Sequence, residues 1–169
     1  MQIIAYIKNF GEISKENCEK YLLQFGIKAQ IHPEIDFETD SGFMPFKVEF
    51  PAIDALKDGV FLSGFEIYTD VYKYQKKMFQ KFIVNPEIDD VLKSCGYSIS
   101  LVYHDCAEGV MALAFASYLA ESGNGIVHEV ESGEYYYQEI RRRVYEDIKD
   151  FFDILEPDVL TPFEGWSKE

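Results

Sequence analysis

Residues 97–131 read "YSISLVYHDCAEGVMALAFASYLAESGNGIVHEVE". The first eight, 97–104, alternate apolar and polar side chains, a pattern typical of a half-buried β-strand. From 106 to 121, apolar residues recur on nearly every side of a helix, so we expect this helix to be enclosed by other elements. Residues 125–131 predict another strand. We therefore expect a strand, helix, strand unit at the centre of the hydrophobic core.

On the N-terminal side, apolar runs predict strands at residues 2–7, 27–31, 43–50 and 60–68. The last two should form an antiparallel pair, because 43–50 alternates apolar and polar side chains and a loop containing Pro51 and Gly59 joins it to 60–68. A helix that starts at the N-cap Ser14 and stops at Gly26 separates the first two strands.

Two helices are expected between residue 69 and residue 96. The first starts at Thr69, because one helical stripe then contains Val71, Tyr74, Gln75, Met78 and Phe82. The second lies in "NPEIDDVLKSCG", residues 85–96, where Asn85 is the N-cap, Pro86 takes the first helical position and Gly96 follows the end.

The last long helix is expected from 135 to 155, with a buried stripe at Tyr137, Ile140, Val144, Ile148, Phe151 and Leu155. After Pro157 the chain either tucks Phe163 and Trp166 onto the domain or stays loose, so 157–169 is treated as a loosely held tail. Residues 1–169 therefore predict a single α+β domain, with a mixed, mostly antiparallel sheet of about five or six strands and helices packed against it.

The composition restricts the classes of partner. Of 169 residues, 47% are hydrophobic and 16% aromatic, enough to build a folded core. The formal net charge is -14, from 30 acidic and 16 basic residues, so a nucleic-acid backbone would be repelled. The same charge favours a basic protein partner, although it also keeps a protein soluble without any binding role.

Neither a signal sequence nor a membrane span is expected. The N-terminus "MQIIAYIKNFGEISKEN" has no basic region followed by a long apolar one, and no stretch approaches about 18 apolar residues. The three cysteines, Cys18, Cys95 and Cys106, are odd in number and widely spaced. We expect reduced thiols and a cytoplasmic protein.

The segment "YHDCAEG", residues 103–109, is the candidate for a thiol site. Cys106 would lie at a helix N-terminus, which favours the thiolate, and His104 is the nearest base. The alternative, which we favour, is that Asp105 is an N-cap and Glu108 completes a capping box. If 97–104 and 125–131 are parallel strands, His128 is about 15 Å from His104, too far to serve the same thiol.

No metal or other cofactor is expected. His104 and Cys106 are the only close pair of metal-ligating type, and the sequence has no CxxC, HxxxH or HExxH motif. The acidic run "PEIDFETDSG" fails as a calcium loop, because counting from Asp36 puts Gly42 at position 7 and Lys47 at position 12.

Acidic residues suggest two surfaces for a basic partner. Residues 126–169 hold 12 acidic and 5 basic residues, a net of -7, half of the charge of the whole protein. The first surface is an extended acidic segment and the second is the face of the last helix with its flank. Their residues are Glu34, Asp36, Glu38 and Asp40 in the first, and Glu134, Tyr135, Tyr136, Glu146, Asp147 and Asp150 in the second.

Two segments, "MALAFASYLAESGNGIVHEVESGEY" at 111–135 and "LSGFEIY" at 62–68, resemble small uncharacterised bacterial α+β proteins that include immunity-type proteins of polymorphic toxin systems. That resemblance implies a cytoplasmic binding protein and brings no catalytic motif. The leading hypothesis is a non-catalytic acidic protein that masks a basic toxin or nuclease. The alternatives are a thiol-dependent enzyme centred on Cys106 and His104, or a small-ligand regulatory module.

Overall fold

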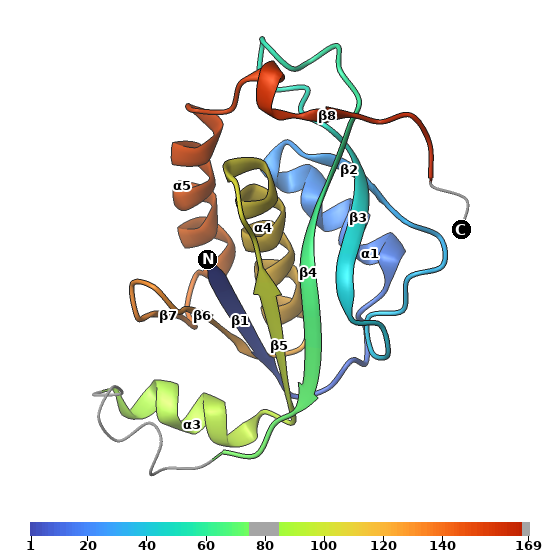
Figure 1. Ribbon diagram of the computed structural model, residues 1–169. Helices are drawn as coiled ribbons and strands as arrows, with labels where there is room; N and C mark the ends of the chain where they lie inside the picture. The colour runs from blue at the N-terminus through green and yellow to red at the C-terminus, as the bar shows by residue number, and fades with distance from the viewer. Residues whose placement is uncertain (75–84, 167–169) are drawn as a thin grey trace.

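The computed structural model describes residues 1–74 and 85–166. These residues form one α+β domain (Figure 1). The strands are β1 (Gln2–Ile7), β2 (Lys28–Ile31), β3 (Gly42–Glu49), β4 (Phe61–Val71), β5 (Tyr97–Val102), β6 (Ile126–Glu129), β7 (Glu134–Tyr136) and β8 (Thr161–Pro162). The helices are α1 (Lys15–Leu22), α3 (Pro86–Ser94), α4 (Cys106–Ser122) and α5 (Ile140–Phe152), with short 3-10 turns η1 (Leu23–Phe25) and η2 (Pro157–Val159).

The sheet follows the order β2-β3-β4-β5-β1-β6-β7, and β8 pairs with β4 off this path. All pairings between the described strands are antiparallel. The sheet has eight strands rather than five or six. The two that the sequence did not predict, β7 and β8, have only three and two residues, too few for an alternating pattern.

The predicted strand, helix, strand unit is present as β5, α4 and β6, but its two strands do not pair with each other. Strand β1 lies between them and pairs antiparallel with both. Consequently β5 and β6 run parallel to each other with one strand between them, and the N-terminus of the chain is built into the centre of the sheet.

Helix α4 packs against one face of the sheet, with α1 and α5 on either side of it (Figure 1). It is buried all round, as its composition predicts. The Phe115 ring is packed among the rings of Phe37, Phe46 and Phe65, with centroids 5.2, 6.2 and 5.2 Å away. The two buried hydroxyls of α4 are satisfied, because those of Ser117 and Tyr21 are 2.6 Å apart and Tyr118 hydrogen-bonds the backbone of Ser14.

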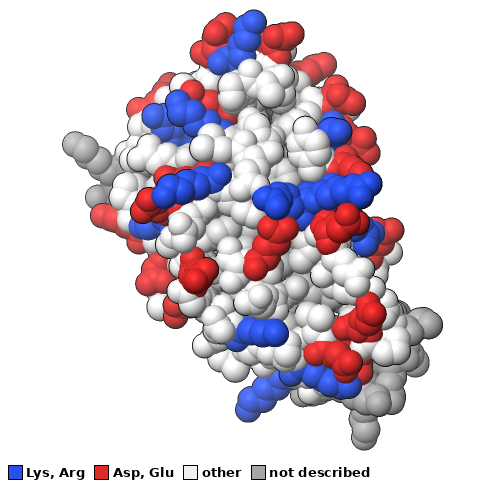
Figure 2. Space-filling model, turned by 180° about the vertical axis from the view of Figure 1, so that it is seen from behind, with Lys and Arg blue, Asp and Glu red and all other residues white. Residues whose placement is uncertain are grey.

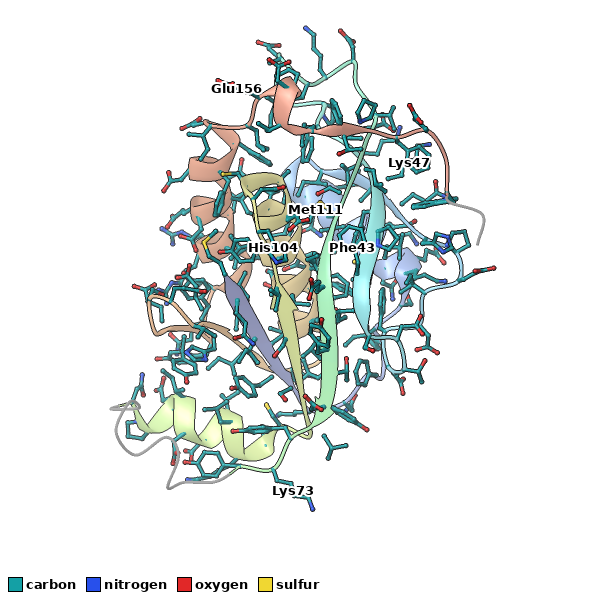
Figure 3. All side chains as sticks on the ribbon, in the orientation of Figure 1. Phe43, Lys47, Lys73, His104, Met111 and Glu156 are labelled. Atoms are coloured by element: carbon teal, nitrogen blue, oxygen red, sulfur yellow. The ribbon has the colours of Figure 1, made fainter. Side chains whose placement is uncertain are left out.

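Helix α3 covers part of the opposite face, where Leu92 and Cys95 pack against Tyr6, Ile126 and Tyr135. Its start is the predicted one. The Asn85 side chain accepts a hydrogen bond from the amide of Glu87 at 2.9 Å. The rest of this face is open between β3 and β4, where Phe43 (Figure 3) and Tyr68 are exposed.

The helix predicted from Thr69 is wrong at its start. Strand β4 continues to Val71, because Thr69 and Val71 pair with Ile99 and Tyr97 of β5. The remaining members of the predicted stripe, Gln75, Met78 and Phe82, lie outside the described residues.

The last helix begins at Ile140 rather than at residue 135. Residues 134–136 form β7 instead, because they pair with Val127–Glu129 across a turn at Gly133, whose φ of 74° suits glycine. The buried stripe itself is confirmed for Ile140, Val144 and Ile148.

The C-terminal segment packs on the domain as far as residue 166. Strand β8 pairs with Phe61 and Leu62, and the amide of Phe163 donates to the carbonyl of Val60 at 2.9 Å. The Trp166 ring lies edge-on to Phe163, at 4.9 Å between centroids. Lys47, next to this segment in Figure 3, lies over the Phe163 ring.

Candidate functional site

The segment 103–109 is a helix start, as we favoured. Asp105 is the N-cap of α4, and its carboxylate accepts from the amide of Glu108 at 2.9 Å. The Glu108 carboxylate reaches back and accepts from the amide of His104 at 2.8 Å, one residue before the cap. Two amides that would otherwise lack partners are therefore satisfied by this acidic pair.

His104 lies where β5 ends and α4 begins (Figure 3), and 63% of its side chain is exposed. Its Nδ1 atom is 3.2 Å from the Glu108 carboxylate. Cys106 is half-buried and packs against the main core. Among the described hydrogen bonds, none joins the Cys106 thiol to His104, so the contacts of this segment are those of a cap.

The other two histidines have different neighbours. His128 lies opposite Ile4 in the sheet, and its ring stacks on Tyr135 with 4.2 Å between centroids. Burial lowers the pKa of His128, so the ring is held neutral. His32 lies edge-on to Trp166 at 4.9 Å. The described ring contacts of these histidines do not involve Cys106.

The acidic segment at 34–40 is not extended. It forms turns, in which the Asp36 carboxylate accepts from the amide of Glu38 at 2.9 Å and the Asp40 carboxylate accepts from the amide of Asp36 at 2.8 Å. Phe37 between them is buried against Phe115. Two of the four carboxylates therefore cap backbone groups, which leaves Glu34 and Glu38 as exposed charges rather than a continuous row.

Tyr135 and Tyr136 are buried, so they do not form the exposed contact surface that we expected. They point to opposite sides of β7: Tyr135 packs with the α3 side of the sheet, and Tyr136 packs in the main core. Pairing with β6 places β7 in the sheet, where the α3 cluster covers the Tyr135 face and the main core covers the Tyr136 face.

The acidic residues of α5 fall into two groups. Glu146 and Asp150 are exposed, and Glu146 pairs with Arg142 at 3.6 Å. Figure 2, which views the molecule from behind, shows Lys and Arg side chains interspersed with Asp and Glu rather than one acidic field. Asp147 is half-buried, and its carboxylate accepts from the Tyr136 hydroxyl at 2.8 Å.

Four carboxylates gather where the β6–β7 hairpin meets α5 and the N-terminus. We call this the carboxylate cluster: Glu129, Glu131, Glu134 and Asp147. Glu129 and Glu134 are direct partners across the β6–β7 pair, an arrangement of like charges that is unfavourable by itself. Glu129 is not recognisable as a member from the sequence alone, because its proximity to Glu134 and Asp147 depends on the pairing of β7 with β6.

Two cations lie beside the carboxylate cluster. Arg143 contacts Glu134 at 3.3 Å while its guanidinium lies 4.3 Å from the Tyr136 ring centroid, and the N-terminal ammonium is 4.0 Å from Glu131. Glu129 and Asp147 form no ion pair with any described residue. Burial, and then the charges of Glu129 and Glu134, raise the pKa of Asp147 above its ordinary value.

No group of three His, Cys, Asp or Glu side chains within residues 1–74 and 85–166 is arranged to hold a metal ion. The helices in those same ranges include none with the length and apolar character needed to cross a bilayer. No protein-family model matches the chain, and neither a curated protein nor a solved structure is significantly similar to it.

Proposed function

We propose that this protein is a non-catalytic binding protein for a basic protein partner, most concretely an inhibitor or immunity-type protein for a basic toxin or nuclease. The observation that carries the proposal is the carboxylate cluster, where, among the described residues, Arg143 and the N-terminal ammonium are the cations that contact four carboxylates. A basic partner would supply the positive charge that this part of the molecule lacks.

The overall charge supports the same conclusion. With a net charge of -14, the protein attracts basic partners over a range set by the ionic strength, about 8 Å at physiological salt. This attraction raises the rate of association more than it slows dissociation, so binding should weaken as salt is added.

The surroundings of the cysteines favour binding over thiol chemistry. Burial raises the pKa of Cys18 well above its ordinary value and that of Cys95 to about 11. Both thiols are therefore protonated near neutral pH and are poor nucleophiles. Cys106 has no described hydrogen bond to a base, and the acidic pair beside it is occupied in capping α4.

The test is capture of partners by the immobilised protein at low salt, followed by titration of the purified partner. A basic protein should be recovered, and its affinity should fall steeply with added NaCl. The triple variant Glu129→Gln, Glu134→Gln, Asp147→Asn should bind it at least about tenfold more weakly.

The matched control removes the same three charges elsewhere: Glu34→Gln, Glu38→Gln and Asp150→Asn, all at exposed positions. This control should keep most of the affinity. Recovery of no basic protein at low salt, or an equal loss of affinity in both triple variants, would contradict the proposal.

A further inference from the structure

His128 on β6 has a ring nitrogen that is both buried and unpaired. Its Nδ1 atom is buried from solvent and has no hydrogen-bond partner within residues 1–74 and 85–166. The imidazole lies flat on the Tyr135 ring, with 4.2 Å between centroids and 2° between the ring planes. Ile4 of β1 lies opposite His128 on its other side. The ring is therefore fixed between two strands, with one nitrogen turned away from water.

The titratable groups that share this side of the sheet are mostly uncharged. Burial raises the pKa values of Tyr6 on β1, of Tyr135 on β7 and of Cys95 at the end of α3, so all three are neutral near pH 7. The charged pairs of α3 are internal to the helix, namely Asp89 and Asp90 with Lys93.

Glu131, in the turn between β6 and β7, is the charge that acts on His128, and it favours the protonated ring. The same carboxylate accepts from the amide of Gln2 at 2.8 Å and lies 4.0 Å from the N-terminal ammonium. The face of Tyr135 also favours a cation. Burial opposes both effects and lowers the pKa of His128 below its ordinary value of 6.5.

The chemistry of the imidazole makes the unpaired nitrogen of His128 sensitive to pH. A neutral ring with its proton on Nε2 has only a lone pair at Nδ1, whereas an imidazolium has an N–H donor at each nitrogen. Protonation of the closed structure would therefore bury an N–H group that has neither water nor a described acceptor. The ring takes up a proton more readily once Nδ1 reaches water.

The strand that covers the His128 ring is a short one. Strand β7 has three residues, lies at the edge of the sheet and pairs with β6 alone among the described strands (Figure 1). Its Tyr135 is the direct partner of His128. Separation of β7 from β6 would expose the imidazole, and a short edge strand opens at a lower free energy than the centre of a sheet.

We propose that His128 is an acid-sensitive lock of the β6–β7 hairpin: its neutral ring holds β7 in the sheet, and protonation of the ring releases β7. This inference goes beyond the proposed function and does not depend on it. Because the Tyr136 hydroxyl of β7 donates to Asp147, release of β7 would also disconnect the hairpin from α5.

The direction of the pH effect follows from the two states of the hairpin. In the open form the ring regains its ordinary pKa of 6.5, so the open form binds a proton more tightly than the closed form does. The opening constant of β7 should therefore increase as pH falls below 6.5, by up to about tenfold per pH unit, until the lowered pKa of the closed form is reached.

The test is amide hydrogen exchange of the full chain, followed by NMR between about pH 7.5 and 5.5 and corrected for intrinsic exchange rates. The opening constant of the β7 amides should increase by about tenfold over this range, while that of the β5 amides stays level. In the protein labelled with 15N at histidine, the His128 ring should show the Nε2–H tautomer at neutral pH and a titration midpoint below 6.5.

Two variants separate His128 from the other titrating groups. His128→Phe keeps a flat ring on Tyr135 and cannot be protonated, so the opening constant of β7 should stay level with pH. His104→Gln, which removes an exposed histidine, should keep the wild-type response. If His128→Phe does not fold, His128→Gln takes its place with the same expected result.

A β7 opening constant that stays level in the wild type down to about pH 5.5 would overturn the inference. An equal increase in the wild type and in the uncharged His128 variant would overturn it as well, because the proton would then bind elsewhere. So would a His128 titration midpoint at or above 6.5.

Discussion

At the scale of single residues, the three thiols illustrate how much burial changes chemistry. Cys18 is fully buried in the main core, and burial raises its pKa well above the ordinary value. Cys95 packs under α3 and has a pKa raised to about 11 by burial. Cys106 is half-buried at the start of α4 and is the most exposed of the three thiols.

We therefore expect Cys106 to react first with iodoacetamide near neutral pH. Raising the pKa of Cys95 from 9.0 to about 11 reduces its thiolate fraction roughly 100-fold, and Cys18 should react only when the protein unfolds. Peptide mass spectrometry over time gives the order. The Cys106→Ser variant should lose the fast phase. If Cys106 reacts no faster than Cys95, the thiol-dependent alternative is eliminated as well.

Asp147 gives a residue-scale prediction on pH. Its pKa is raised in the folded state by burial, Glu129 and Glu134, and these effects outweigh Arg143 and the hydrogen bond from Tyr136. The folded protein therefore binds this proton more tightly than the unfolded chain, and the group lowers stability as pH rises from the ordinary value of 3.8 through the raised one.

The Asp147→Asn variant lacks this pH-dependent loss of stability, while its amide oxygen can still accept the hydrogen bond from the Tyr136 hydroxyl. The free energy of unfolding of the variant, relative to wild type, should increase with pH across that window and level off above it. Urea unfolding at pH values between about 3 and 7 measures the difference. Asp150→Asn is the control. A relative stability that falls with pH would contradict the raised pKa.

At the scale of elements, the central strand β4 contains two neighbouring residues, Ser63 and Gly64, whose surroundings are unusual for a strand. Ser63 points into the core and is 6% exposed, and its hydroxyl has no hydrogen-bond partner within residues 1–74 and 85–166. Gly64 points to the opposite face, where an added Cβ would lie 2.2 Å from the Met44 carbonyl oxygen and 2.8 Å from the Phe43 ring. Strand β4 therefore requires glycine at position 64 and tolerates an unpaired hydroxyl at position 63.

Alanine at these two positions should have opposite effects. Ser63→Ala removes a buried, unpaired hydroxyl and should stabilise the protein by about 1 kcal/mol. Gly64→Ala forces β3 and β4 apart against a backbone atom and should cost about 2 kcal/mol. Urea unfolding of each variant measures both, and each serves as the control for the other. Destabilisation by Ser63→Ala would mean that its hydroxyl is satisfied in solution.

At the scale of the whole molecule, the net charge of -14 opposes compaction. The carboxylate cluster concentrates part of that repulsion within the fold. Most described ion pairs, such as Lys20 with Glu16, are exposed and contribute little to stability. Added salt should therefore weaken the repulsion between like charges of the folded protein more than it weakens the attraction within its ion pairs.

We expect the free energy of unfolding to rise as NaCl increases from about 0.1 to 1 M, because the Debye length falls from about 10 to 3 Å. The triple variant Glu129→Gln, Glu134→Gln, Asp147→Asn should gain less from salt than wild type does. Thermal unfolding at each salt concentration measures both. Destabilisation of the wild type by NaCl would show that attractive pairs dominate.

Features that depend on contacts between residues close in the sequence were predicted correctly, whereas features that depend on contacts between distant residues were not. The starts of α3 and α4 were predicted correctly because Asn85 and Asp105 cap amides within three residues. The helix expected from 135 was wrong in its first turn, since Tyr135 and Tyr136 pair with β6. The acidic run at 34–40 alternated like a strand, but Phe37 turns into the core and the aspartates cap turns.

By itself, the sequence determined the α+β class, the enclosed helix α4, the helix caps and the acidic charge, because these depend on composition and on contacts a few residues apart. Only the tertiary structure decided that β1 lies between β5 and β6 and that β7 closes a hairpin against α5. Those pairings place Glu129 and Glu134 beside Asp147 of α5. Such proximity follows from strand register, which long-range packing sets.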